Sequence, residues 1–331
     1  MNKQTKNLDN KKFGMSMGTV IQRFSPIFIL LILITIFSVL TDNFFQISNF
    51  LNIVRQSAIL GIVAMGMTLV ILTAGIDLSV GSMMTVAACV AGVGATAWGL
   101  GPVVAILFGT VCGVAIGVLN GVIITQGKIQ PFIATLGMMT AAGGVALLIT
   151  GGMPITGIPS SMLEAGSRTF VVAGVPGVPV SVFVFAAVAI VSWVLLNKTT
   201  FGRNLIALGG NAEAARTSGI RVERMLIIVY ALSGLFSSIG GFVLMGRINS
   251  SNALMGGGME LQAITAVALG GTSLAGGFGS IGGTVIGVIT IGVLNNGLDL
   301  MDVSAAWQRV ILGSMIILVV IFDAWRIRRF E

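Results

Sequence analysis

The chain has 331 residues, of which 55% are hydrophobic and only 9% are charged, with a formal net charge of +7. A soluble domain of this size would carry about 25% charged residues, so the composition excludes a water-soluble globule and indicates an all-α, polytopic integral membrane protein. Because there are no histidines, and because Cys89 and Cys112 form no CxxC motif, His-based catalysis, zinc sites and redox motifs are excluded as well.

Ten segments are apolar enough to be predicted as membrane-spanning helices, since a span needs about 20 apolar residues. In chain order they are 24–41, 57–74, 82–99, 102–124, 131–150, 178–196, 225–246, 260–276, 281–298 and 307–323. Two of them, 57–74 and 260–276, are short and run into glycine-rich sequence, so we expect them to be broken or re-entrant. No small-residue cleavage site follows the first segment, which indicates a retained anchor.

The distribution of Lys and Arg predicts the orientation of these segments. Five lie in residues 1–23, one is Lys128, five lie in 197–224 and three lie in 324–331. With ten spans and a cytoplasmic N-terminus, all of these fall on the cytoplasmic side, as the positive-inside rule requires. Arg55, Arg168, Arg247 and Arg309 fall outside. We therefore expect a cytoplasmic N-tail (1–23), a transmembrane domain (24–323) and a cytoplasmic C-tail (324–331), and we relate the basic charge to lipid headgroups and not to nucleic acid.

Glycine marks the expected helix contacts. In lipid, helices associate through close packing, so small residues lie on contact faces. The fourth predicted span carries glycine at every fourth position, which forms a stripe where a neighbouring backbone can approach: Gly109, Gly113, Gly117 and Gly121. The stripe either only holds the bundle together or also lets helices slide during gating.

Two further segments, 73–82 and 269–280, indicate irregular backbone at membrane depth. Gly75, Leu78 and Gly81 in the first align with Gly271, Leu274 and Gly277 in the second, and the string IGVLN occurs at both 116–120 and 291–295. These similarities predict two weakly related halves. Broken helices in both halves commonly flank a transport pathway.

Several polar residues inside or beside the spans need a role. Asp77 or Ser79 either caps the third span or lines a pathway or gate, because a carboxylate within a membrane is costly. The other pathway candidates are Asn120, Gln262, Asn295 and Asn296. No ladder of charged side chains runs through the spans, so the candidate lining of amides and hydroxyls suits a neutral, hydroxyl-rich solute.

The segment 197–224 is the longest predicted cytoplasmic connection. Asn211 can cap a short helix, Glu213 then lies in its first turn, and Gly219 is placed to end it. Ala214, Ala215 and Ser218 give this helix little bulk. It is either an ordinary connection or a surface helix that docks into a groove of another protein.

Motifs along most of the chain resemble the permease subunit of bacterial ribose-type ABC importers. They are GMTLVIL (66–72) leading to GIDLSVGS (75–82), Lys128 followed by PFIATLGM (131–138), ALGGN (207–211), LGGTSLAGG (269–277) and LNNGL (294–298). The likeness covers about residues 25–323.

The resemblance implies an assembly of two permease subunits, a cytoplasmic ATPase and an extracytoplasmic sugar-binding protein in a bacterial inner membrane. ATP and Mg would be bound by the ATPase, in agreement with the absence of a G-x-x-x-x-G-K-[ST] motif here, so no cofactor is expected on this chain. The resemblance assigns the ATPase contact to Gly202, Arg203, Gly209, Gly210, Asn211, Glu213, Ala214, Ala215, Ser218 and Gly219. It implies that the transported substrate is a neutral monosaccharide, with ribose as the first candidate. The sugar would cross the membrane by alternating access at the interface between two permease subunits.

The residues leave two other classes of protein to consider, a secondary active transporter and a membrane-embedded transferase. A secondary active transporter of a small polar solute could also have ten spans, but it would more commonly carry ion-coupling carboxylates within the membrane. A membrane-embedded transferase would need Asp, His or Arg clustered at one membrane face, and the sequence has no such cluster.

Overall fold

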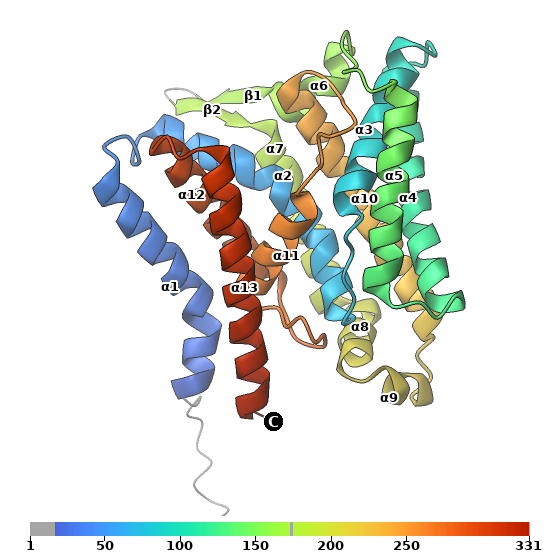
Figure 1. Cartoon of the computed structure of the whole chain (residues 1–331), viewed down its shortest axis with the longest axis vertical. Coiled ribbons are helices and arrows are strands. Elements are labelled where there is room, and N and C mark those ends of the chain that lie inside the picture. The colour runs from blue at the N-terminus through green and yellow to red at the C-terminus, as the bar shows by residue number, and fades with distance from the viewer. Residues whose placement is uncertain (1–16, 173–174, 331) are drawn as a thin grey trace, which may run out of the picture.

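The structure is a computed structural model that describes residues 17–172 and 175–330. The predominantly helical fold comprises α1 (Met17–Leu40), α2 (Ile47–Leu72), α3 (Val80–Thr96), α4 (Pro102–Gln126), α5 (Pro131–Thr150), α6 (Ser160–Ser167), α7 (Val180–Lys198), α8 (Thr200–Gly210), α9 (Ala212–Thr217), α10 (Val222–Ile248), α11 (Met259–Leu269), α12 (Ile281–Leu300) and α13 (Ala305–Phe330). Two short strands, β1 (Thr169–Val172) and β2 (Val175–Pro179), form an antiparallel ribbon between α6 and α7 (Figure 1). The expectation of an all-α chain did not include this ribbon.

Six helices in the described part of the chain are long and apolar enough to cross a membrane: α2, α4, α5, α7, α10 and α12. The other four predicted spans coincide with shorter apolar stretches, which are Pro26–Leu40, Val80–Thr96, Met259–Leu269 and Ala305–Leu318. Each predicted span therefore overlaps a helix, while the count of ten crossings stays a prediction.

The expectation that segment 57–74 is short was wrong, because α2 is an unbroken helix of 26 residues. The prediction began the span after Arg55 and Gln56, but the helix starts at Ile47 and contains both polar residues. Arg247 likewise lies in the last turn of α10 and not in a connecting loop. The predicted spans were too short because polar residues inside long helices were taken to lie outside the membrane segment.

The second expected break is present at α11. This helix has 11 residues, so at about 1.5 Å per residue it covers only about half of a hydrocarbon core that is about 30 Å thick. The chain reaches it through an irregular segment in which Ser251 pairs with Ile155 and the Gly256 N–H donates to Thr85 Oγ1 at 3.1 Å. The loop 270–280 then leads from α11 to α12, so irregular backbone flanks the short helix on both sides (Figure 1).

The centre of the bundle is formed by α2 and α10. From Ser57 to its end at Leu72, every residue of α2 is buried, and the helix contacts α7, α10, α11 and α12. Helix α10 packs chiefly against α4, where Gly113, Gly117 and Gly121 of the glycine stripe lie at the contact, while Gly109 faces Ala87 of α3. An added Cβ at Gly117 would lie 2.2 Å from the Tyr230 carbonyl oxygen, and one at Gly113 would lie 3.2 Å from the Gly234 carbonyl oxygen.

The two ends of the bundle differ. Figure 1 shows α8 and α9 at one end, together with the N-terminal part of α1 and the C-terminal part of α13, and α6 with the β-ribbon at the opposite end. Helix α1 begins within the predicted N-tail, and α13 continues through 324–330 of the predicted C-tail. Residues 1–16 of the predicted N-tail lie outside the described residues. The start of α1, the end of α13 and α9 thus share one end of the bundle.

Candidate functional site

Asp77 is the centre of a buried polar cluster in the connection between α2 and α3. Its Oδ1 atom accepts hydrogen bonds from the Ser79 N–H at 2.9 Å and from Ser79 Oγ at 2.6 Å. Its Oδ2 atom accepts a hydrogen bond from Ser233 Oγ of α10 at 2.8 Å. Both carboxylate oxygens are therefore satisfied, although Asp77, Ser79 and Ser233 are completely buried.

The cluster extends to two more helices. Asn120 Nδ2 of α4 donates to Ser79 Oγ at 2.8 Å. Thr135 Oγ1 of α5 accepts from the Leu78 N–H at 3.1 Å and lies 3.0 Å from the Ile76 carbonyl oxygen. The expected side-chain cap of α3 is absent, because Ser79 at the N-cap position makes no side-chain cap bond and Asp77 accepts from the Ser79 N–H, which precedes the helix. The cluster instead ties the irregular segment 73–79 to α4, α5 and α10. Asp77, Ser79 and Asn120 lie together here and away from the other pathway candidates.

A junction of closely packed backbones joins α8 to both irregular connections. An added Cβ at Gly209 would lie 1.8 Å from the Leu72 carbonyl oxygen and 2.5 Å from the Gly277 nitrogen. The Gly277 N–H itself donates to the Leu72 carbonyl at 3.0 Å. Gly277 has a φ of +71°, in the left-handed region that favours glycine. We call Leu72, Gly209 and Gly277 the glycine junction. It puts the end of α8 in direct contact with the end of α2 and with the loop 270–280.

The short helix in 197–224 forms as the sequence predicts. Asn211 Oδ1 accepts hydrogen bonds from the Glu213 and Ala214 N–H groups at 3.0 Å and 2.9 Å. Gly219 follows α9 with a φ of +86°, and its N–H donates to the Arg216 carbonyl at 3.0 Å. An ion pair between Arg216 and Glu223 connects α9 to the first turn of α10. The helix is therefore held in one position by caps at both ends and by this ion pair.

The two alanines of α9 face opposite ways. Ala215 is only 4% exposed and packs into the main core cluster, whereas Ala214 is exposed. Asn211, Glu213, Ser218 and Gly219 are exposed beside Ala214. A partner that approaches α9 would therefore meet Ala214 and not Ala215.

The remaining coupling candidates lie on α8. Gly202 is buried where α7 turns into α8, and an added Cβ there would lie 1.9 Å from the Leu196 carbonyl oxygen. Arg203 and Gly210 are exposed.

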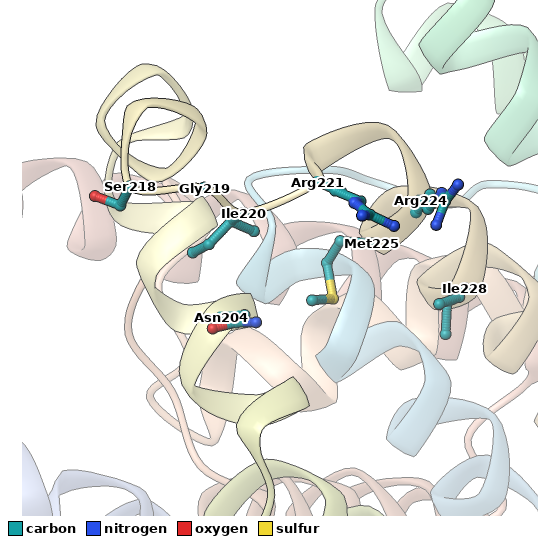
Figure 2. Close-up of a pocket in the computed structure, with 8 residues that line it drawn as sticks. All are labelled: Asn204, Ser218, Gly219, Ile220, Arg221, Arg224, Met225 and Ile228. Atoms are coloured by element: carbon teal, nitrogen blue, oxygen red, sulfur yellow. The ribbon is translucent and has the colours of Figure 1, made fainter.

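A recess of about 430 Å³ opens between α8 and the start of α10. Figure 2 shows the residues that line it, which are Asn204, Ser218, Gly219, Ile220, Arg221, Arg224, Met225 and Ile228. Arg221 and Arg224 make its rim basic. The recess thus adjoins the exposed side of the segment that follows α9.

The other pathway candidates lie toward the opposite end of the bundle. Asn296 Nδ2 of α12 donates to Asn49 Oδ1 of α2 at 2.8 Å, so Asn296 joins two helices. Asn295 and Gln262 instead line a polar cavity of about 120 Å³ between α2, α10, α11 and α12. The neighbouring residues Asn295 and Asn296 therefore have different surroundings.

Sequence reasoning missed three polar residues that line this cavity. Gln56 and Ser57 belong to α2 and Arg247 to α10. Gln56 and Arg247 were assigned to loops because the predicted spans were too short. If the second span had been predicted to start at Ile47, where α2 begins, Gln56 would have been placed within the membrane segment. Ser233 was also missed, because nothing in the sequence relates it to Asp77, which lies 156 positions earlier.

Comparison with known proteins identifies the family. The model of the family described as "branched-chain amino acid transport system / permease component" matches residues 49–320. The chain belongs to this permease family. No match to a solved structure was found.

The permease is also similar to individual proteins over almost its full length. It is 43% identical to the ribose import permease protein RbsC of Bacillus subtilis over 97% of this chain and 98% of that protein. It is 45% identical to RbsC of Escherichia coli strain K12 over 89% of this chain and 91% of that protein. The fructose import permease protein FrcC of Rhizobium meliloti is 36% identical over 91% and 84%. The sequence resemblance to sugar permeases is thus confirmed at the level of the family.

Proposed function

We propose that the permease is the membrane subunit of an ATP-driven, binding-protein-dependent importer of a neutral monosaccharide in a bacterial inner membrane, with ribose as the first candidate. The observation that carries this proposal is the identity of 43% and 45% to two ribose import permeases over nearly the whole chain. Fructose and galactose permeases are similar at 36% to 38%, so ribose ranks first among several sugars.

The proposed assembly contains two copies of the permease, a cytoplasmic ATPase that binds ATP and Mg, and an extracytoplasmic sugar-binding protein. In this assembly α9 is the part that meets the ATPase. The rigid capping of α9, its exposed Ala214 and the basic recess beside it support this assignment. The start of α1 and the end of α13 lie at the same end of the bundle as α9, which supports the assignment of this end to the cytoplasmic side.

The contacts of α8 suggest how a displacement of α9 would be transmitted to the transport pathway. A displacement of α9 would be transmitted to α8, which precedes it directly, and from Gly209 to Leu72 and Gly277 through contacts that leave no space for a Cβ. Both irregular connections would move together, because each contacts this junction. The buried cluster around Asp77 would hold segment 73–79 to α4 and α10 during this motion. The result is alternating access driven from one end of the bundle.

A competition experiment tests the sugar. The permease is reconstituted into proteoliposomes with its cognate ATPase and binding protein, and uptake of radiolabelled ribose is measured with unlabelled ribose, fructose or galactose in excess. We expect unlabelled ribose to suppress uptake most strongly. Transport of fructose or galactose in preference to ribose would keep the importer class and change the sugar, and the absence of any sugar uptake would contradict the proposal.

A further inference from the structure

The polar cavity near the end of the bundle opposite α9 has the features of a ligand site. The polar part of its lining comes from α2 and from the three consecutive helices α10, α11 and α12: Gln56, Ser57, Arg247, Gln262 and Asn295. Leu60, Met259 and Gly292 complete the lining. Arg247 is the penultimate residue of α10, a helix that begins directly after α9. The cavity is therefore separated from the proposed ATPase contact by almost the whole length of α10.

Two polar atoms at this cavity lack the partners that buried groups normally have. Ser57 Oγ and Asn295 Oδ1 are buried and make no hydrogen bond within the described part of the chain. Ser57 is 3% exposed. An unsatisfied buried hydroxyl is costly unless a water or a ligand supplies the missing hydrogen bond.

Many buried hydroxyls in the bundle are satisfied without a ligand, although among the described residues Ser181 of α7 and Ser237 of α10 lack a hydrogen-bond partner as Ser57 does. Thr68, Ser192 and Ser238 each donate to the carbonyl oxygen four residues earlier, at 2.7 to 2.8 Å. That bond satisfies a hydroxyl inside an apolar helix without any ligand. Ser57 makes no such bond within the described part of the chain. Its hydroxyl is instead directed at Gly292, where an added Cβ would lie 2.0 Å from Ser57 Oγ.

The lining also specifies the chemistry of the ligand. Gln56, Gln262 and Asn295 each offer an amide donor and an amide acceptor, and Ser57 offers a hydroxyl that can do either. Arg247 adds donors to the lining, which contains no carboxylate. Side chains that both donate and accept hydrogen bonds suit the hydroxyls of a sugar, because each hydroxyl can also donate and accept a hydrogen bond. The volume of about 120 Å³ corresponds to about four waters at about 30 Å³ each, which is room for one hydroxyl-bearing edge of a monosaccharide.

We infer that Ser57, Gln262 and Asn295, with Gln56 and Arg247 beside them, form a subsite that binds the hydroxyls of the transported sugar in the half of the pathway distant from the ATPase. This inference rests on the proposed function. It assigns different roles to two neighbouring residues: Asn295 binds sugar, while Asn296 holds α12 to α2 through Asn49.

Ligand protection of introduced thiols tests the subsite. Cys89 and Cys112 are replaced by serine, and Gln262→Cys, Asn295→Cys and Ser304→Cys are each made in that background. Each variant is reconstituted with the ATPase and the binding protein, and its reaction with a small thiosulfonate reagent is timed with and without millimolar ribose. We expect ribose to slow labelling at positions 262 and 295 by about threefold or more and to leave labelling unchanged at exposed Ser304 in the loop after α12.

Uptake by alanine variants provides the second readout. Asn295→Ala and Gln262→Ala are expected to lower the maximal rate of ribose uptake by about fivefold, which corresponds to one lost hydrogen bond, with normal abundance and normal co-purification of the ATPase. Asn296→Ala, the matched control, is expected to lower abundance more than uptake per folded molecule. If the wild-type complex transports ribose but ribose protects neither position, the cavity holds only water and the inference is wrong. If no variant and no wild-type complex transports ribose, the proposed function itself fails.

Discussion

At the scale of single residues, the buried carboxylate of Asp77 is the feature that most needs a physical explanation. A charged side chain at the centre of a membrane helix costs about 2.5 to 3.5 kcal/mol on insertion scales. Three hydrogen bonds from Ser79 and Ser233 offset this cost, and Asn120 extends the cluster. The side chain is completely buried within the bundle. Its geometry therefore favours a positioning role in segment 73–79 over direct contact with a solute.

Two substitutions separate the positioning role from a need for negative charge. Asp77→Asn keeps an acceptor for both Ser79 bonds and can donate an amide hydrogen to Ser233 Oγ, so folded yield and uptake should stay close to wild type. Asp77→Leu leaves the Ser79 N–H without an acceptor and should lower stability by about 2 to 4 kcal/mol. Thermal unfolding and uptake per folded molecule are measured for both, with Asp42→Leu at an exposed site as the control. An Asp77→Asn protein that folds normally but cannot transport would show that the charge itself is required.

At the scale of secondary-structure elements, the exposed face of α9 provides the sharpest test of the ATPase contact. Ala214→Glu adds a charge to an exposed position of a helix that tolerates Glu well, so the permease should insert normally, lose co-purification of the ATPase and lose sugar uptake. Burying that charge on docking would be costly unless it found a partner. Ala214→Ser, which keeps the side chain small, should behave like the wild type. Retention of ATPase binding and uptake by Ala214→Glu would mean that α9 is only a connector.

The neighbouring position gives a contrast that the sequence alone did not predict. Ala215 is buried in the core cluster. Ala215→Glu would bury a charge within the permease itself, so it should reduce the yield of folded permease whether or not the ATPase is present. A normal yield of Ala215→Glu would contradict the packing of α9 against the bundle.

The contact between α4 and α10 can be tested in the same way. Gly117 lies where a Cβ would overlap the Tyr230 carbonyl, whereas nothing lies within 4 Å of a Cβ at Gly137 of α5. Gly117→Val should destabilise the permease by about 1 to 3 kcal/mol through overpacking, and Gly137→Ala should be neutral or slightly stabilising because alanine favours helix. Thermal unfolding in detergent compares the two, and equal effects would contradict the assigned contact.

Much of this element-level structure could be predicted because it depends on local sequence. The ten apolar segments, the irregular stretches at 73–79 and 270–280, and α9 with its Asn211 cap all follow from hydropathy, glycine placement and capping. Features that depend on the assembled fold could not be predicted. The Ser233 partner of Asp77, the burial of Ala215 and the meeting of Ser57 with Gly292 each join residues whose proximity no local pattern specifies. The β-ribbon was missed because its strands are short and its second strand contains glycine and proline.

At the scale of the whole molecule, the orientation of the bundle remains to be tested. In a background without Cys89 and Cys112, Ser160→Cys in α6 should react with an impermeant maleimide in intact cells, and Ser218→Cys after α9 should react only once the membrane is permeabilised. Both serines are exposed, and the segment 197–224, which contains α9, carries five Lys and Arg residues. Labelling of Ser218→Cys from outside intact cells would contradict the topology with ten spans and both termini inside.

The account as a whole depends on the source of energy for transport. In the proposed assembly, the motion of the permease is driven by an ATPase that contacts α9. The most direct measurement is ribose uptake into proteoliposomes that contain the permease, the ATPase and the binding protein. ATP is supplied on the ATPase side, and ion gradients are collapsed by ionophores. The account predicts that uptake continues under these conditions and stops when the ATPase is inactivated. Uptake that instead follows an ion gradient and persists without ATP hydrolysis would contradict it and favour a secondary active transporter.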